Sequence, residues 1–97
     1  MKKIFVTRKL LKENEDKLKE LFDVDLNPND KIYTAEEIIE RSKNCNGILS
    51  SVTDPINSET ISKLSDKVKI IANGAVGFGN IDIKAARKKG IIVTNTP

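Results

Sequence analysis

Residues 68–94 read VKIIANGAVGFGNIDIKAARKKGIIVT and contain a strand, a glycine-rich loop, a helix and a second strand in succession. The β-branched, largely apolar stretch 68–72 predicts the first strand, and 91–94 predicts the second. Between them, Asp82 is placed to cap the start of a helix that Gly90 ends as the C′ residue. Two strands joined through a helix run parallel and are connected by a right-handed crossover.

The same alternation extends back to the N-terminus. Thr34 and Glu37 form a capping-box pattern at the start of one helix, and Asn57 is a good N-cap for the next. Strands are predicted over 3–7, 24–26 and 47–50, and helices over 10–22, from Thr34 onward and over 57–64. The pattern predicts an α/β fold, a flavodoxin-like parallel five-stranded sheet in the order 2-1-3-4-5 with helices on both faces.

The end of the chain departs from this class of fold. Only Asn95, Thr96 and Pro97 follow the last predicted strand, whereas such a domain normally continues into a fifth helix beside the first. We therefore expect the final helix to be missing and one face of the sheet to be covered by helix 10–22 alone, with apolar surface exposed. Leu11, Leu18, Leu21 and Phe22 are predicted to form the apolar face of that helix.

Composition excludes several kinds of chemistry. The 97 residues suffice for one small domain, and they include no histidine and a single cysteine, Cys45. Nucleophile pairs that need histidine, Cys/His zinc sites and an internal disulfide are therefore excluded, and Cys45 is expected to be an inert, reduced thiol. The longest apolar runs span three residues, too few for a membrane helix, so we expect a cytoplasmic protein. The 17 basic and 14 acidic residues are interspersed, which argues against a nucleic-acid partner, and with such short apolar runs no membrane partner is expected either.

The loop after the fourth predicted strand contains Gly74, Gly77 and Gly79, spaced G-x-x-G-x-G. This spacing reverses the dinucleotide fingerprint G-x-G-x-x-G, so we reject a dinucleotide site in this loop. Two interpretations stay open. The backbone amides of the loop form a nest for a small carboxylate, or the glycines only permit a tight turn.

Residues 69–97 carry a longer composite motif. It consists of an apolar strand, then NGAVGFGNID over 73–82, then AARKKGIIVTNTP over 85–97. In this motif the chain resembles the D-isomer-specific 2-hydroxyacid dehydrogenases, and within them the glyoxylate/hydroxypyruvate reductase branch. The run Gly47-Ile48-Leu49 and the pair Thr53-Asp54 also fit, so the resemblance extends weakly over the whole chain.

The resemblance implies that residues 1–97 are the N-terminal portion of the substrate-binding (catalytic) domain of a two-domain enzyme. The Rossmann NAD(P)-binding domain and the family's catalytic Arg, Glu and His belong to later segments, which are absent from this sequence. By the same resemblance, a C-terminal segment returns to complete the substrate domain. We therefore expect no catalytic, cofactor-binding or metal-binding residue in this chain.

The resemblance also implies roles for particular residues. Val76 and Gly77 match the pair whose backbone amides bind the substrate carboxylate, and Ala75 adjoins them. Ser51 and Val52 match a loop that lines the substrate pocket, although a solvated loop hydroxyl is an equally good interpretation of Ser51. The interdomain hinge is matched by Thr96 and Pro97.

The expected protein is a truncated NAD(P)-dependent D-2-hydroxyacid dehydrogenase. The intact enzyme would interconvert a 2-oxo acid of the glyoxylate or hydroxypyruvate type and a D-2-hydroxy acid by hydride transfer, as a homodimer using NAD or NADP. This chain would supply the carboxylate cradle, bind no nucleotide tightly and be inactive alone. The alternative is a stand-alone flavodoxin-like module that binds a small ligand or a protein.

Overall fold

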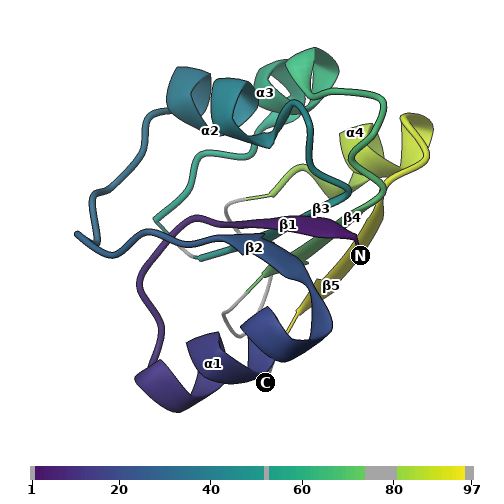
Figure 1. Cartoon of the computed structure of the whole chain (residues 1–97). Helices are drawn as coiled ribbons and strands as arrows, with labels where there is room; N and C mark the ends of the chain where they lie inside the picture. Colours follow the sequence, from purple (N-terminus) through teal and green to yellow (C-terminus); the bar gives the residue numbers. More distant parts are fainter. Residues whose placement is uncertain (1, 52, 74–80, 96–97) are drawn as a thin grey trace.

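A computed structural model describes residues 2–51, 53–73 and 81–95, and these form one parallel sheet with helices on both sides (Figure 1). The strand order is β2-β1-β3-β4-β5, which confirms the predicted order. The strands are β1 (Lys3–Val6), β2 (Asp23–Asp25), β3 (Gly47–Ser50), β4 (Ile70–Asn73) and β5 (Ile92–Asn95). The helices are α1 (Lys12–Leu21), α2 (Ala35–Ser42), α3 (Ser58–Lys63) and α4 (Ile83–Lys88).

The hydrophobic core lies between the sheet and the layer formed by α2, α3 and α4, which Figure 1 shows together on one side. Side chains alternate between the two faces of a strand, and Phe5, Ile48 and Ile71 occupy neighbouring register positions on the core side. They are almost fully buried, as are Ile38 of α2 and Ile61 of α3. This layer fixes the three central strands whose carboxyl ends carry the candidate site.

Capping side chains start the helices where the sequence predicts. Thr34 accepts a hydrogen bond from the Glu37 amide at 3.2 Å, and the Glu37 carboxylate accepts one from the Thr34 amide at 3.1 Å. This reciprocal pair is the predicted capping box. Asn57 caps α3 and Asp82 caps α4, each by accepting from the amide three residues on. Because these contacts are local in sequence, the pattern of residue types sufficed to place them.

Gly90 ends α4 with a φ of 81°, in the left-handed region that favours glycine. We expect Gly90→Ala to lower the free energy of unfolding by about 1 kcal/mol, because a Cβ is strained at this φ. The space around the position is open, so strain alone sets the cost. Urea denaturation of the two proteins measures the difference. Asn at position 90 should cost less than Ala, since asparagine tolerates the left-handed region better.

The opposite face of the sheet carries only α1 among the described elements (Figure 1). There, Ile4, Gly47, Ile70 and Ile92 lie side by side in register across four strands, and we call them the apolar row. A groove of about 400 Å³ runs beside this row and is also lined by Leu18 and Phe22. Ile92 keeps 62% of its surface exposed and Ile70 keeps 37%. The expected exposed apolar face is therefore present.

The predicted apolar face of the first helix differs from the observed one. Leu11 precedes α1 as its N-cap and is 67% exposed, and Leu21 is 57% exposed. No α1 residue is buried, and only Leu18, together with Phe22 just beyond the helix, reaches the groove. The physical reason is that the helix lies toward the β2 edge and nothing described here packs against its outer leucines.

Candidate functional site

The carboxyl ends of β1, β3 and β4 meet at one edge of the sheet, where open α/β folds bind ligands. β1 continues into Thr7 and Arg8, and β3 ends at Ser50 and continues into Ser51. Ser50 donates a hydrogen bond to the side-chain oxygen of Asn73 at 3.0 Å, and both side chains are buried. Buried polar contacts of this kind hold the ends of two strands in a fixed relation.

Asp54 is a buried carboxylate at the centre of this edge, with 1% of its surface exposed. One of its oxygens accepts hydrogen bonds from the Thr7 hydroxyl and from the Ser51 amide, the latter at 2.8 Å. The Ser51 hydroxyl reaches the same oxygen at 3.4 Å. A carboxylate is costly to bury unless donors surround it, so this arrangement stabilises one conformation of the turn after β3.

Arg8, which follows β1, joins the segments after β2 and β3 to its own above the edge. Its Nε and Nη2 donate to the two carboxylate oxygens of Asp30 at 2.8 and 3.1 Å, and its Nη1 donates to the Thr53 hydroxyl at 3.0 Å. The two-point pair is the geometry in which arginine binds a carboxylate best. Asp30 also accepts from the Lys9 amide at 3.0 Å. The hydrogen bond from Arg8, followed by that from Lys9, lowers the pKa of Asp30 from 3.8 to about 2.

The Asp30 carboxyl should therefore titrate near pH 2 in the folded protein, and Arg8→Met should move its pKa back toward 3.8. The pKa is lower in the folded state, so this pair stabilises the fold above about pH 4. That contribution is lost as the pH falls from about 4 toward 2. Carboxyl ¹³C shifts measured by NMR over this range report the titration. An Asp30 midpoint unchanged by Arg8→Met would contradict the assigned cause.

The structure places one of the predicted site residues, Ser51, at this edge and within hydrogen-bonding distance of Asp54. The other predicted site and hinge residues lie outside the described residues. These are Val52, Ala75, Val76, Gly77, Thr96 and Pro97. The residue-by-residue prediction missed Arg8, Asp30 and Asp54 as members of one network. The positions of Arg8 and Asp54 directly after two strands were the available signal.

The described residues do not fit a nicotinamide dinucleotide. A pyrophosphate needs free amides at a helix N-terminus that follows a glycine-rich turn. At the start of α2, α3 and α4, the capping side chain of Thr34, Asn57 or Asp82 already accepts from one of those amides, and the Asp82 carboxylate would repel phosphate. The turn 7–11 before α1 has no glycine. Within the described ranges, no group of three or more His, Cys, Asp or Glu residues is placed to hold a metal ion.

Cys45 is buried two residues before β3, and this burial raises the pKa of its thiol. The thiolate is the reactive form of cysteine, so the structure favours an inert role for this residue. In the portion of the chain that the structure describes, no helix has the length and apolar character needed to cross a bilayer.

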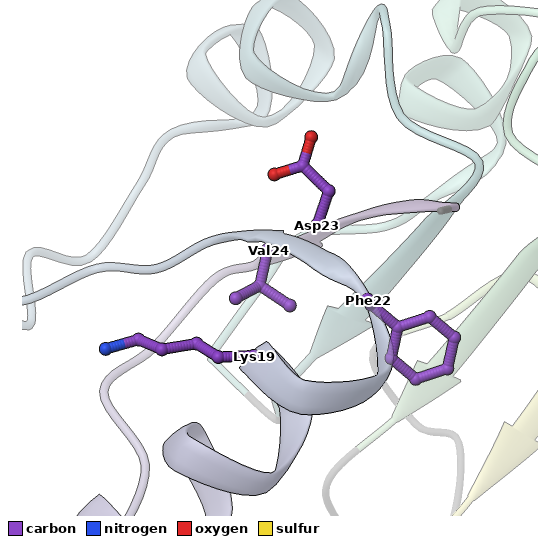
Figure 2. Close-up of a pocket in the computed structure, with 4 residues that line it drawn as sticks. All are labelled: Lys19, Phe22, Asp23 and Val24. Carbon is purple, nitrogen blue, oxygen red and sulfur yellow. The ribbon is translucent and has the colours of Figure 1, made fainter.

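A separate hollow of about 510 Å³ lies beside the end of α1 and β2 (Figure 2). Its lining residues are Lys19, Phe22, Asp23 and Val24. Figure 2 shows that the Lys19 amine and the Phe22 ring extend to opposite sides, and that Asp23 points in a third direction. A binding site needs a few polar groups that converge on one ligand, so we place the candidate site at the carboxyl edge.

Residues 4–97 match the sequence profile of the D-isomer specific 2-hydroxyacid dehydrogenases, catalytic domain. The chain belongs to this family. It is 42% identical over 95 residues to the glyoxylate reductase of Korarchaeum cryptofilum and 34% identical over 95 residues to that of Pyrococcus horikoshii. Each match covers 98% of this chain and 28% of the relative. The chain therefore spans a little over a quarter of the length of these family members.

Solved structures of the dehydrogenase family share the fold. A Polaromonas sp. JS6 66 protein described as a D-isomer specific 2-hydroxyacid dehydrogenase superposes with a TM-score of 0.95 at 34% identity, over 100% of this chain and 30% of that one. The NAD⁺-bound 3-phosphoglycerate dehydrogenase of Entamoeba histolytica gives 0.81 at 31% identity, over 99% of this chain and 33% of that one. The chain is the N-terminal, substrate-binding part of a dehydrogenase of this family.

Proposed function

We propose that this chain forms one wall of the substrate site of an NAD(P)-dependent enzyme that reduces a 2-oxo acid of the glyoxylate or hydroxypyruvate type. The observation that carries the proposal is the 42% identity to a glyoxylate reductase over nearly the whole chain. In the proposal, the backbone amides of Val76 and Gly77, beside Ala75, bind the substrate carboxylate. Ser51 and Val52 line the pocket, and Thr96 and Pro97 belong to the hinge.

The arrangement of the described edge supports this role. The described residues on both sides of 74–80 are fixed, since Asn73 is buried at the end of β4 and Ile81 pairs with Ile56 in a β-bridge. Ser51 lies on the neighbouring strand end. Backbone amides suit a small carboxylate, because several can converge on one anion without bulky side chains. The chain's own contribution would be to bind and orient the acid, and the nicotinamide cofactor would supply the hydride.

Because the described residues do not fit a nicotinamide dinucleotide, we propose that another domain binds it. Residues 1–97 would then bind no nucleotide tightly and be inactive alone. The intact enzyme would be a homodimer whose other segments include the Rossmann domain. We further propose that one of those segments covers the apolar row. A parallel sheet is normally covered on both faces, and Ile70 and Ile92 are left exposed here.

The test is a comparison of the longer gene product with residues 1–97. Each is mixed with glyoxylate or hydroxypyruvate and with NADH or NADPH, and the loss of absorbance at the reduced nicotinamide band is followed. We expect turnover by the longer protein and none by the short chain. Turnover by the short chain would overturn its proposed inactivity. A longer protein that reduces neither acid with either cofactor would refute the proposed reaction and favour a binding module.

A further inference from the structure

The edge of the sheet contains a continuous series of polar contacts that starts at Asp30 and ends at Asp54. Arg8 holds Asp30 at two points and donates to Thr53, and the Thr53 hydroxyl lies 2.9 Å from the Ser51 hydroxyl. Ser51 then continues to Asp54. These residues come from the turns after β1, β2 and β3, so a single arginine joins three loops that are far apart in sequence.

Each contact in this series restricts the geometry of the next one. The Asp30 backbone has a φ of 50°, an uncommon conformation for a residue other than glycine, so its carboxylate is presented by a defined turn. The Arg8 side chain keeps 25% of its accessible surface, and its planar fork is directed by the two-point pair with Asp30. Only Nη1 is then left to reach Thr53 at 3.0 Å. The position of the Thr53 hydroxyl is thus set by a group outside its own loop.

We propose that Arg8 is a positioning residue for 2-oxo acid binding, which acts through Thr53 to hold the Ser51 hydroxyl at the substrate site. This inference rests on the proposed function, because it takes Ser51 to line the pocket. Arg8 itself is occupied by Asp30 and Thr53 and does not touch the acid. Its contribution is to keep the loop after β3 in the binding conformation, which lowers the loss of conformational freedom when the acid binds.

The test uses the longer enzyme with Arg8→Met, Arg8→Lys and Thr53→Val, and with Lys63→Met as a control. Lys63 forms an exposed ion pair with Glu59 on α3, away from the carboxyl edge. We expect Arg8→Met to raise the KM for glyoxylate about 10-fold while the KM for the nicotinamide cofactor is unchanged. Arg8→Lys should recover part of this loss, because one ammonium reaches Asp30 or Thr53 but does not reproduce the fork. Lys63→Met should leave both KM values unchanged.

Thr53→Val separates positioning from general stabilisation. If Arg8 acts through Thr53, the double variant should raise the glyoxylate KM no more than the larger of the two single changes. The inference would be overturned if the increases in glyoxylate KM were additive in the double variant, or if Arg8→Met left that KM unchanged. In either case, reductase activity of the wild type would still support the proposed function. If Arg8→Met does not fold, the glyoxylate KM values of Arg8→Lys, Thr53→Val and their double variant are compared in the same way, and they decide whether Arg8 acts through Thr53. A wild-type enzyme with no reductase activity would refute the proposed function and this inference with it.

Discussion

Asp54→Ala should lower the free energy of unfolding by about 3 kcal/mol, one of the two largest single-residue effects we expect in this domain. The substitution removes a buried oxygen that accepts from Thr7 and Ser51. The Ser51 amide would then lose this acceptor, which adds a desolvation cost, and the buried Thr7 hydroxyl would keep only a longer contact with the Leu49 carbonyl at 3.4 Å. Urea denaturation followed by circular dichroism measures the change.

Two variants control this expectation. Asp54→Asn keeps an oxygen in place and should cost less than Asp54→Ala, about 1 kcal/mol. Asp66→Ala changes an exposed aspartate and should stay within about 0.5 kcal/mol of the wild type. If Asp54→Ala costs no more than Asp66→Ala, the carboxylate does not organise the edge as described.

Ile92→Lys should have a small effect on the stability of the short chain and a large one on that of the longer protein. In residues 1–97 the Ile92 side chain is 62% exposed, so a lysine there should change the free energy of unfolding by less than about 0.5 kcal/mol. If another segment covers the apolar row in the longer protein, the same lysine is buried without a partner charge. The cost is then about 3 kcal/mol or more, because an unpaired buried charge is strongly destabilising.

Ile32→Lys is the matched control, because Ile32 is 58% exposed and does not line the groove. It should have a small effect in both proteins. Thermal denaturation of the four variant proteins and their two parents supplies the comparison. Equal, small shifts for Ile92→Lys in both would show that nothing covers the row, and the proposed completion of the domain would be wrong.

The fold was predictable because its signals are local. Strand order followed from the βα alternation, and the helix starts at Thr34, Asn57 and Asp82 followed from capping chemistry that spans three residues. The apolar face of α1 was predicted less well. Periodicity identified Leu11 and Leu21 as candidates for burial, but burial depends on a packing partner that the periodicity of one helix does not specify.

The site was predictable only in part, for a related reason. The family resemblance and its place after a strand made Ser51 a candidate, and the structure brings its side chain to Asp54. The Arg8–Asp30 pair joins positions that are 22 residues apart, and it depends on how the turn after β2 bends back over the edge. No spacing rule connects two such positions. Their contact follows from the tertiary structure, and the sequence shows only that charged residues follow the strands.

Because no residue of α1 is buried, the stability of this helix should depend on whether a further segment packs beside it. Isolated helices of about this length are marginal in water, so the α1 amides should exchange with deuterium by local opening that leaves the sheet intact. A segment packed into the neighbouring groove would contact Leu18 and Phe22 and would slow that exchange. The protection of one helix thus reports whether a further segment has docked in the groove, without any need to follow turnover.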